Sequence, residues 1–289
     1  MEKELTQKIL VLGASGMIGH QIYNNLILNE NYDVLAHHSS NKFINASHLV
    51  DFFNFEDLRN FIEKEQPHIT INCTGILIEE SERDYPKAIY LNSYIPHAVK
   101  KLVNSYGGKL IQISTDCVFS GNNGPYSELD KKDGISNYSL TKGLGEIDDD
   151  INLTLRTSVI GPDYKPYSTE LLHWYLNQQQ NIEGYKKSLW SGVTSIYFAK
   201  VVNYFINSNI TGIYNVSSSQ SISKYDLLIM LERRFDRGIN ISKVDGLISN
   251  KILIDTRKLL GLEVPSYEFM IDELYNQMKN NHEYSHYFK

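Results

Sequence analysis

The sequence predicts an α/β protein built on a doubly wound parallel sheet, and two observations carry this prediction. Short apolar runs that are typical of buried strands alternate with helical patterns over the first 160 residues or so, which is the pattern of successive βαβ units. A glycine-rich turn, Gly13 to Gly19, joins the first strand to the first helix. After about Gly161 the alternation ends, so a second, smaller part is expected there.

The elements of the first part follow from two kinds of pattern. Continuous short apolar runs indicate strands that are buried on both faces, and apolar residues spaced three and four apart indicate helices. The expected strands are residues 8–12, 32–36, 69–73, 109–114 and 153–156. The expected helices are residues 17–28, 55–65, 85–106 and 137–147.

The second part has a less regular pattern. Its expected helices are residues 168–180, 194–206, 223–234 and 266–278, and its expected strands are residues 212–216 and 252–254. Ser221 or Ser223 is placed to cap the helix at 223–234, because a serine hydroxyl accepts a hydrogen bond from the first free backbone amides.

Composition excludes several classes of protein. The chain has 289 residues, with 28 Lys plus Arg against 34 Asp plus Glu, so its formal charge is −6. A weakly acidic chain without a basic tract is not expected to bind nucleic acid or an anionic membrane. We find no apolar run of about 18 residues and no signal-like segment, since Met1–Lys8 is charged. A cytoplasmic protein whose two cysteines, Cys73 and Cys117, are free thiols is expected.

The turn after the first strand indicates a dinucleotide site. It has the spacing Gly13-x-x-Gly16-x-x-Gly19, in which the first glycine permits the tight turn, the second lets backbone approach a pyrophosphate, and the third permits close packing of helix on strand. Backbone amides at a helix N-terminus bind phosphate. The neighbouring residues expected to contact the cofactor are Ser15, Met17 and Ile18.

The end of the second strand bears on the choice between NADP and NAD. An NAD enzyme usually carries a carboxylate there for the ribose 2′-hydroxyl, but the stretch Ala36-His-His-Ser-Ser-Asn-Lys42 has none. His37, Ser39 and their neighbours are suited to a 2′-phosphate instead. NADPH is therefore expected, with NADH as the alternative. Further along, Asp51 and Phe52 precede the next helix, where such folds hold the adenine.

A tyrosine and a lysine one helical turn apart form the catalytic candidate. In Tyr138-x-x-x-Lys142 both side chains share a helix face, and an ammonium group favours the phenolate and moves the pKa of the phenol toward the working range. Thr115, at the end of the fourth expected strand, places a hydroxyl at the same sheet edge. A second copy, Tyr275-x-x-x-Lys279, is expected to be a surface coincidence.

One stretch has the spacing of a metal-binding motif but lacks a third ligand. His282-Glu-Tyr-Ser-His286 has the spacing of a zinc protease helix, but no later residue supplies a third ligand. No metal site is expected.

The residues also carry a resemblance that covers nearly the whole chain. Besides the glycine turn, its marks are Ile71–Gly75, Leu91–Asn92, Ser114–Gly121, Pro125–Glu128, Tyr138–Glu146 and Leu155–Ser158. The most specific is Ser114-Thr-Asp-Cys-Val-Phe-Ser-Gly121. On these motifs the chain resembles the extended short-chain dehydrogenases/reductases and, within them, the dTDP-4-dehydrorhamnose reductase-like family.

The resemblance implies a fold and a reaction. It implies a Rossmann domain, about residues 1–160 plus 194–217, and a small discontinuous nucleotide-sugar lobe, about residues 161–193 plus 218–289. The implied reaction is reduction by NADPH of the C4 keto group of a nucleotide-linked 4-keto-6-deoxy sugar, a step in deoxysugar and surface polysaccharide biosynthesis. A homodimer is compatible with the resemblance.

The resemblance also assigns roles. Tyr138 protonates the oxyanion, Thr115 orients it, and Lys142 holds the nicotinamide ribose. The expected cofactor contacts of the third strand and the following helix are Cys73, Thr74, Gly75 and Asn92. The expected substrate contacts are Thr115, Val118, Phe119, Trp190 and Thr194.

Departures from the family pattern leave the substrate and the exact activity open. Residues 76–82, 189–194 and 250–255 differ from the usual rhamnose-enzyme motifs, so a UDP-linked N-acetylated 4-keto sugar is a second substrate candidate. The same fold could also serve a nucleotide-sugar epimerase or an NADP-binding regulatory subunit. A 4,6-dehydratase is disfavoured because Cys117 stands where that class has a glutamate, and a thiol in apolar surroundings is a poor replacement for a carboxylate.

Overall fold

The structure is a computed structural model that describes residues 6–38, 47–49, 51–164, 168–258, 261 and 263–288. The chain divides into two compact units. Unit 1 comprises residues 1–118, 134–156 and 199–214, and unit 2 comprises residues 119–133, 157–198 and 215–289.

Unit 1 alternates strands and helices. Its strands are β1 (Gln7–Leu12), β2 (Tyr32–His38), β3 (Ser47–Leu49), β4 (Ile69–Asn72), β5 (Lys109–Thr115), β6 (Leu153–Thr157) and β11 (Gly212–Asn215). Its helices are α1 (Met17–Leu26), α2 (Phe55–Glu65), α3 (Ile78–Arg83), α4 (Tyr85–Ala88), α5 (Ile95–Asn104), α6 (Asn137–Leu144) and α8 (Ser195–Ile206), with a π-helical turn η1 (Ile89–Tyr94) and a 3-10 turn η2 (Asp116–Val118). Strands β6 and β11 and helix α8 extend slightly beyond the range of unit 1.

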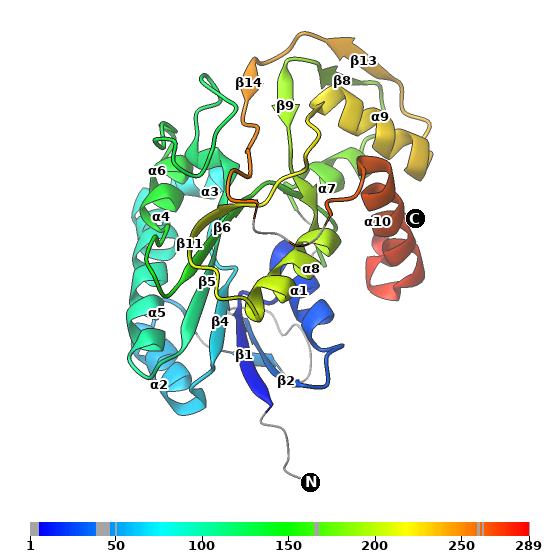
Figure 1. Cartoon of the computed structure of the whole chain (residues 1–289). Helices are drawn as coiled ribbons and strands as arrows, with labels where there is room; N and C mark the ends of the chain where they lie inside the picture. The colour runs from blue at the N-terminus through cyan, green and yellow to red at the C-terminus, as the bar shows by residue number, and fades with distance from the viewer. Residues whose placement is uncertain are drawn as a thin grey trace. The chain divides into compact units, whose positions relative to one another are not determined.

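The strands of unit 1 form one sheet in the order β11-β6-β5-β4-β1-β2-β3 (Figure 1). The pairs β1–β2, β1–β4, β2–β3 and β4–β5 are parallel, with Val11 opposite Ala36 and Leu12 opposite Asn72. The chain runs outward from β1 in one direction through β2 and β3, and in the other through β4, β5 and β6. The strand order therefore switches between β1 and β4, and the carboxyl end of β1 is where a doubly wound sheet binds its ligand. The predicted α/β class is confirmed.

An apolar core lies between the sheet and its helices. Leu10 and Leu12 of β1 belong to one buried cluster with Leu58 and Ile62 of α2 and with Val99 of α5. Figure 1 shows α2 and α5 on one face of this sheet and α1 and α8 on the other. Because helices cover both faces, the central strands are apolar along their length, and this is why they stand out in the sequence as short apolar runs.

The single helix expected at residues 85–106 is three consecutive pieces, α4, η1 and α5. Pro96 occupies the first turn of α5 and has no backbone N–H to donate to the carbonyl of Asn92, four residues earlier. The α-helical ladder is interrupted there, and the π-helical turn holds Asn92. π-Helical turns often occur at functional sites.

Unit 2 has shorter elements. Its strands are β7 (Val159–Ile160), β8 (Ile182–Tyr185), β9 (Ser188–Trp190), β10 (Val193–Thr194), β12 (Ile222–Ser223), β13 (Ile241–Val244) and β14 (Ser249–Asn250), and its helices are α7 (Leu171–Leu176), α9 (Lys224–Phe235), α10 (Tyr267–Asn280) and the 3-10 segment η3 (His282–Phe288). The strands pair as β10-β7, β12-β9-β14 and β13-β8.

Three local expectations in unit 2 have definite outcomes. Ser223 caps α9, because its Oγ accepts a hydrogen bond of 3.1 Å from the backbone N–H of Asp226. The strand expected at 252–254 is only an isolated bridge between Tyr126 and Leu253. The helix expected at 168–180 covers only Leu171–Leu176.

The segment 119–133 packs within unit 2, whereas the expected division of the chain assigned it to the Rossmann domain. The Phe119 and Tyr126 rings stack with centroids 4.1 Å apart. Glu128 is buried, and one of its carboxylate oxygens accepts a hydrogen bond of 2.5 Å from Thr256 Oγ1. Glu128 and Thr256 lie more than a hundred residues apart in the chain, so spacing in the sequence gives no sign of their contact.

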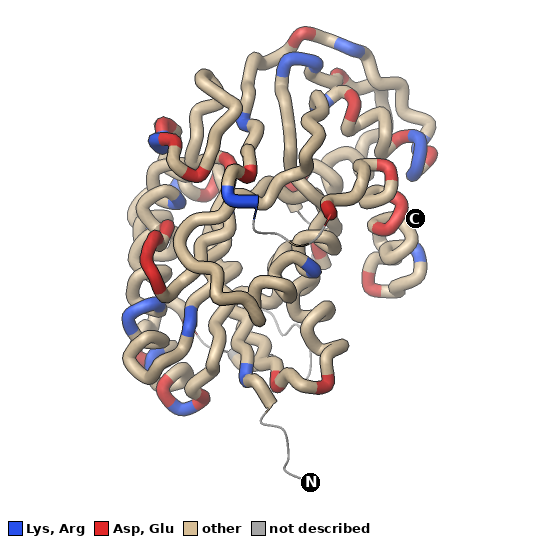
Figure 2. The backbone as a smooth tube through the Cα atoms, viewed as in Figure 1, with Lys and Arg blue, Asp and Glu red and all other residues tan. Residues whose placement is uncertain are grey.

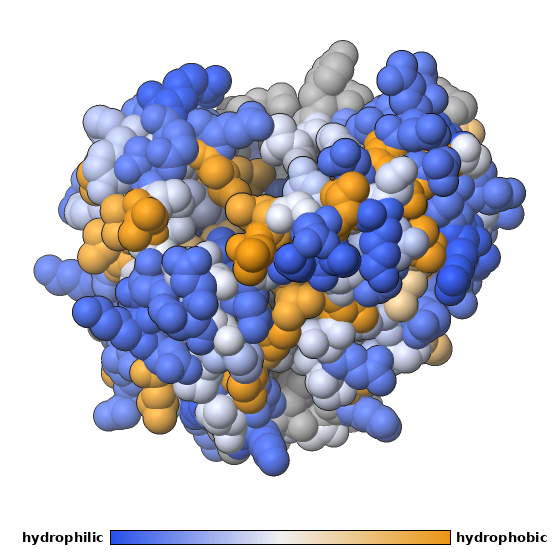
Figure 3. All heavy atoms as spheres, turned by 90° about the horizontal axis from the view of Figure 1, so that it is seen from above, coloured by the Kyte–Doolittle hydropathy of each residue, from blue (hydrophilic) through white to orange (hydrophobic). Residues whose placement is uncertain are grey.

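The surface carries charges of both signs. Figure 2 shows Lys and Arg interspersed with Asp and Glu along the backbone, in agreement with the small net charge. The face in Figure 3 is mostly hydrophilic, with hydrophobic residues in separate groups. Among the described residues, no helix has the length and apolar character needed to cross a membrane.

Candidate active site

The turn between β1 and α1 depends on its glycines. Gly13 has a φ of +75°, a left-handed conformation that disfavours any side chain. A Cβ on Gly19 would lie 2.2 Å from the carbonyl oxygen of Gly13, so only glycine lets the helix pack this closely on the turn. The Ala14 N–H donates to the His37 carbonyl at 2.9 Å, which fixes the turn to β2.

The N-terminus of α1 is suited to an anion. Gly16 occupies the cap position, no side chain caps the helix, and its first turn holds no acidic residue. Ser15, Met17 and Ile18 are all partly exposed around this turn. The backbone amides and the helix dipole together favour a negatively charged ligand.

His20 was not singled out by the sequence, although it closes the first turn of α1. Its ring is fully buried, and Nδ1 donates to the Gly16 carbonyl at 2.8 Å. Burial lowers the pKa of His20 to about 4. The ring is therefore neutral at physiological pH and acts on the turn through this hydrogen bond.

The end of β2 is partly described. The His37 ring is fully buried, and it meets Phe52 edge-on with centroids 4.5 Å apart. Its Nδ1 accepts a long hydrogen bond of 3.4 Å from the Gly13 N–H. Asp51 is exposed and accepts from the Phe53 N–H at 2.9 Å. Ser39 and Lys42 lie outside the described residues.

The loop after β4 approaches both Asn92 and Lys142. Asn92 Oδ1 accepts from the Ile76 N–H at 2.9 Å, and its Nδ2 donates to Thr141 Oγ1 at 3.1 Å. A Cβ on Gly75 would lie 2.8 Å from Asn92 Oδ1 and 3.9 Å from Lys142 Nζ. The Cys73–Gly75 loop, Asn92 and Lys142 therefore lie side by side.

Tyr138 and Lys142 occupy α6, which packs against β5 and η2. The helix begins at a cap residue, Ser136, whose Oγ accepts from the Ser139 N–H at 3.1 Å. Both Tyr138 and Lys142 are buried, and Lys142 Nζ donates to the Ile113 carbonyl of β5 at 2.9 Å.

Thr115 is the last residue of β5, two positions beyond the carbonyl that Lys142 contacts. Its Oγ1 accepts from the Cys117 N–H at 3.1 Å and lies 3.1 Å from Asp116 Oδ1, to which it donates. The hydroxyl is thus held by one backbone amide and one side-chain carboxylate of η2.

Burial dominates the electrostatics around Lys142. It lowers the pKa of the Lys142 ammonium to about 8, and the nearby Glu146 and Cys73 act in the opposite direction. Burial raises the pKa of the Cys73 thiol to about 12, with Lys142 opposing. Cys73 is therefore a neutral thiol at physiological pH, and the ammonium at this site is close to its titration point.

A buried ionic cluster lies behind Lys142 and was missed as a site by sequence reasoning. Arg156 donates to both carboxylate oxygens of Glu146, at 2.7 and 2.8 Å, and Ser114 Oγ donates to Oε1 at 2.7 Å. The side chains of Arg156 and Glu146 are 2% and 1% exposed. The only signal in the sequence is that Glu146 follows Lys142 by four residues within the helix expected at 137–147, although α6 ends at Leu144.

The expected substrate residues divide between the two units. Val118 is buried in unit 1. In unit 2, Trp190 is 3% exposed and donates from Nε1 to Ser158 Oγ at 2.8 Å, while Phe119 and Thr194 are also buried. The structure thus places the catalytic candidates and the described cofactor candidates in unit 1, and the cofactor, catalytic and substrate roles all stay predictions.

The two sequence coincidences lie in unit 2. The Tyr275 ring of α10 lies 4.1 Å from the Arg234 guanidinium carbon and 5.7 Å from Lys279 Nζ. His282 and His286 belong to η3, a 3-10 segment rather than an α-helix, so they do not share a face at the spacing that the zinc motif requires.

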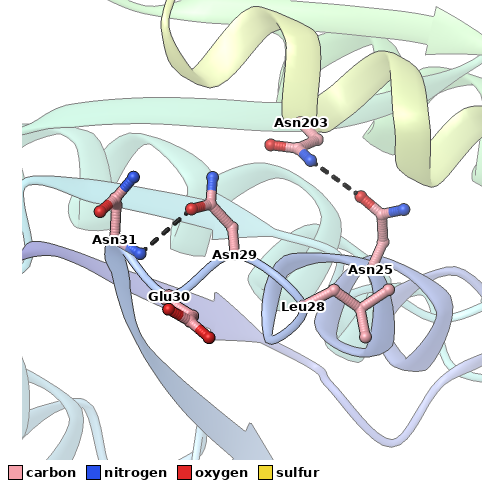
Figure 4. A pocket seen from close by; sticks show the side chains of 6 residues that line it. All are labelled: Asn25, Leu28, Asn29, Glu30, Asn31 and Asn203. Atoms are coloured by element: carbon pink, nitrogen blue, oxygen red, sulfur yellow. Dashed lines mark hydrogen bonds between the residues drawn. The ribbon is translucent and has the colours of Figure 1, made fainter.

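A pocket of about 550 Å³ lies elsewhere in unit 1, around the C-terminal end of α1 (Figure 4). Its lining residues are Asn25, Leu28, Asn29, Glu30, Asn31 and Asn203, and Asn203 Nδ2 donates to Asn25 Oδ1 at 3.1 Å. None of the expected site residues lines it. It adjoins the start of β2, whereas the glycine turn lies at the other end of α1.

A doubly wound sheet, a glycine-rich turn after β1 and a tyrosine–lysine helix after β5 together define the extended short-chain dehydrogenase/reductase class. The chain belongs to the family described as the RmlD substrate binding domain, whose model matches residues 7–236. The resemblance inferred from the motifs is thereby confirmed.

Two known relatives are similar to this chain in sequence over about half of its length. Over 145 residues, 48% of this chain and 42% of the relative, the chain is 34% identical to methionine adenosyltransferase 2 subunit beta of Danio rerio. Over 140 residues, 48% and 45% of the two chains, it is 29% identical to dTDP-4-dehydrorhamnose reductase of Shigella flexneri. These matches span less than half the length of either relative.

A solved structure shows the same fold over nearly the whole chain. The structure of dTDP-4-dehydrorhamnose reductase from Bacillus anthracis str. Ames in complex with NADP superposes with a TM-score of 0.82. The match covers 96% of this chain and 100% of that one, at 21% sequence identity.

Proposed function

We propose that this protein uses NADPH to reduce the C4 keto group of a nucleotide-linked 4-keto-6-deoxy sugar. The observation that carries the proposal is the geometry of α6. This helix holds Tyr138 one turn before the buried Lys142. Lys142 Nζ donates at 2.9 Å to the carbonyl of Ile113, and Ile113 lies two residues before Thr115 in β5. The family, and the Shigella flexneri relative named as such a reductase, support it.

The residues of unit 1 fit a nicotinamide dinucleotide. A pyrophosphate needs a close backbone approach and an uncapped helix N-terminus, and Gly13, Gly16 and α1 supply both. The Cys73–Gly75 loop beside Lys142 is where the nicotinamide ribose would bind. The Bacillus anthracis structure, which contains NADP, supports this choice of cofactor.

NADPH rather than NADH is proposed from the described end of β2. His37 and His38 stand there, and neither is a carboxylate that would bind a free ribose 2′-hydroxyl. The buried His37 ring contacts the turn through its Nδ1, which accepts from the Gly13 N–H. The NADPH preference is therefore proposed from the lack of a carboxylate at these two positions, and the ratio of the NADPH and NADH dissociation constants tests it.

The mechanism assigns a task to each side chain. When bound, the cofactor supplies a hydride to C4. Tyr138 then donates its phenolic proton to the oxygen that was the keto group. Thr115 turns its single hydroxyl proton from Asp116 Oδ1 toward the same oxygen, donates a hydrogen bond to it and orients it. Lys142 binds the nicotinamide ribose, and its positive charge lowers the cost of forming the tyrosinate.

NADPH consumption with two substrates made in situ tests the proposal. These are dTDP-4-keto-L-rhamnose and a UDP-linked 4-keto-6-deoxy-N-acetylhexosamine. Turnover with either is expected, and Tyr138→Phe is expected to lower it by about 10²- to 10⁴-fold, the typical contribution of a positioned general acid.

The chain provides its own matched control for that variant. Tyr275 is the tyrosine of the second Tyr-x-x-x-Lys copy, in α10, and Tyr275→Phe removes the same hydroxyl from a site with no proposed role. Unchanged turnover is expected. Equal losses in both variants would contradict a catalytic role for Tyr138.

A second candidate is an NADP-binding regulatory subunit. The similarity to methionine adenosyltransferase 2 subunit beta, at 34% identity over 145 residues, favours it. This candidate predicts NADPH binding without turnover of either sugar. An epimerase, in contrast, would convert the sugar without net consumption of NADPH.

A further inference from the structure

A buried carboxylate anchors the catalytic helix next to Lys142. Glu146 follows the last residue of α6, Leu144, by two positions. It binds Arg156 of β6 through both oxygens and Ser114 of β5 through Oε1. Its side chain is 1% exposed.

Lys142 and Glu146 contact neighbouring residues of one strand. Lys142 Nζ binds the carbonyl of Ile113 at 2.9 Å, and Glu146 binds the hydroxyl of Ser114, the next residue of β5. Thr115 follows directly. The strand end that presents Thr115 is therefore held both by the ammonium and by the carboxylate.

A stabilising role alone does not account for this arrangement. Burying an ion pair removes two charges from water, so a buried pair is often no more stable than apolar residues of the same volume. The pair nevertheless places a full negative charge close enough to Lys142 to oppose the effect of burial on its pKa.

We propose that Glu146, held by Arg156 and Ser114, is a positioning residue that keeps the Lys142 side chain protonated and directed toward the Cys73–Gly75 loop. This inference rests on the proposed function, in which Lys142 binds the nicotinamide ribose. Arg156 and Ser114 fix the carboxylate, so that its charge stays beside the ammonium.

The direction of the effect follows from the groups that face Lys142. These are Glu146 and the Cys73 thiol just after β4, while Tyr138 lies one turn earlier on the same helix as Lys142. Removing the negative charge of Glu146 lowers the pKa of the ammonium. Lys142 then loses its proton at lower pH, so the loss of reductase activity that follows from a neutral Lys142 also moves to lower pH.

Two readouts on the full-length protein test the proposal in Glu146→Gln. The first is the ¹³Cε resonance of Lys142 in protein with ¹³C-labelled lysine, assigned by its absence in Lys142→Met. It is expected to titrate near pH 8 in the unchanged protein and about one unit or more lower in the variant. The second is the pH profile of kcat/KM for NADPH-dependent reduction, whose alkaline limb is expected to shift by a similar amount.

Companion variants separate positioning from stability. Glu146→Asp keeps the charge and is expected to restore the titration of Lys142. Thr154→Val removes a buried hydroxyl that donates to the Ile147 carbonyl at 2.7 Å in the same region, and it is expected to lower stability without moving either readout. If Glu146→Gln does not fold, Glu146→Gln/Arg156→Met removes both charges, leaves no unpaired guanidinium, and is expected to shift both readouts in the same direction.

The outcomes are distinct. An unshifted Lys142 resonance in folded Glu146→Gln protein, or in the double variant, overturns the proposal. A shifted resonance with an unshifted alkaline limb also overturns it, because Glu146 then acts on a lysine that the reaction does not use. If the unchanged protein turns over neither sugar, the proposed function fails, while the resonance and the pH dependence of the NADPH dissociation constant still decide whether Glu146 controls Lys142.

Discussion

The glycine turn makes a prediction that separates folding from cofactor binding. In Gly19→Ala the new Cβ would lie 2.2 Å from the Gly13 carbonyl oxygen and 2.9 Å from its carbon. Both are backbone atoms that cannot rotate away. To reach a 3.0 Å separation, α1 or the turn must move by about 0.8 Å. The free-energy cost of such a shift is comparable to that of inserting an extra group into a packed core.

The energetic cost follows from two opposing effects. Overpacking costs typically 1–3 kcal/mol, and a clash with backbone belongs at the upper end, about 3 kcal/mol. Alanine in a helix gains about 1 kcal/mol over glycine. The net expected loss is about 2 kcal/mol, or about 4–8 °C in the melting temperature of a domain of this size.

Gly16→Ala is the matched variant. Its Cβ would lie 3.4 Å from the same carbonyl oxygen, an ordinary contact. We expect a stability loss of about 1 kcal/mol or less, because alanine is a poorer helix cap than glycine. NADPH affinity should nevertheless fall, since Gly16 is the residue at which backbone approaches the pyrophosphate.

Thermal unfolding without cofactor and NADPH titration by fluorescence measure the two quantities. The packing and binding roles of these glycines are refuted if Gly19→Ala melts at the temperature of the unchanged protein, or if Gly16→Ala binds NADPH with unchanged affinity.

Three other predictions follow from buried and charged groups. Arg156→Met leaves Glu146 as an unpaired buried carboxylate and should cost about 3–5 kcal/mol in urea unfolding; a loss below about 1 kcal/mol would contradict the burial of the pair. Burial by itself would raise the pKa of Asp149, but the Lys100 ammonium and nearby backbone amides outweigh it and hold this pKa at about 2, below its ordinary 3.8. The ionised Asp149 carboxylate thus contributes to the free energy of unfolding above pH 3.8, and this contribution is lost as the pH falls through 2. Asp149→Asn should therefore cost about 1 kcal/mol at pH 7, after allowance for solvent screening, and almost nothing at pH 2. Cys73, with a pKa of about 12, should react with iodoacetamide at pH 8 far more slowly in the folded protein than in urea, and equal rates would contradict the raised pKa of the thiol.

The parts of the site that are local in sequence could be predicted from it. The strand, the turn and the first residues of α1 are consecutive, and each glycine meets a requirement set by atoms a few residues away, such as Gly19 against the Gly13 carbonyl. Tyr138 and Lys142 likewise share one helix. The four-residue spacing of this tyrosine and lysine predicts a shared helix face from helical geometry alone.

The environment of Lys142 could not be predicted in the same way. Ser114, Glu146 and Arg156 come from three separate segments and meet only because β5 and β6 are neighbours in the sheet. The sequence alone indicates only a structural role for Arg156 in its strand. The hydrogen bonds show that it holds the carboxylate beside Lys142.

Unit 2 was the least predictable part of the chain. Its strands are two to four residues long, too short for an alternating pattern to emerge. The segment 119–133 is held by Glu128 and Tyr126 to residues beyond 250. Such contacts depend on tertiary packing rather than on local propensity.

The most direct test of the central claim follows the hydride itself. The protein is incubated with NADPH in which both hydrogens at C4 of the nicotinamide are replaced by deuterium, together with each of the two 4-keto sugars, and the sugar product is examined by NMR. We expect one deuterium at C4 of the sugar in the unchanged protein and in Tyr275→Phe, and almost no product in Tyr138→Phe. Product without deuterium at C4, or NADPH binding without any product from either sugar, would contradict the proposed reduction.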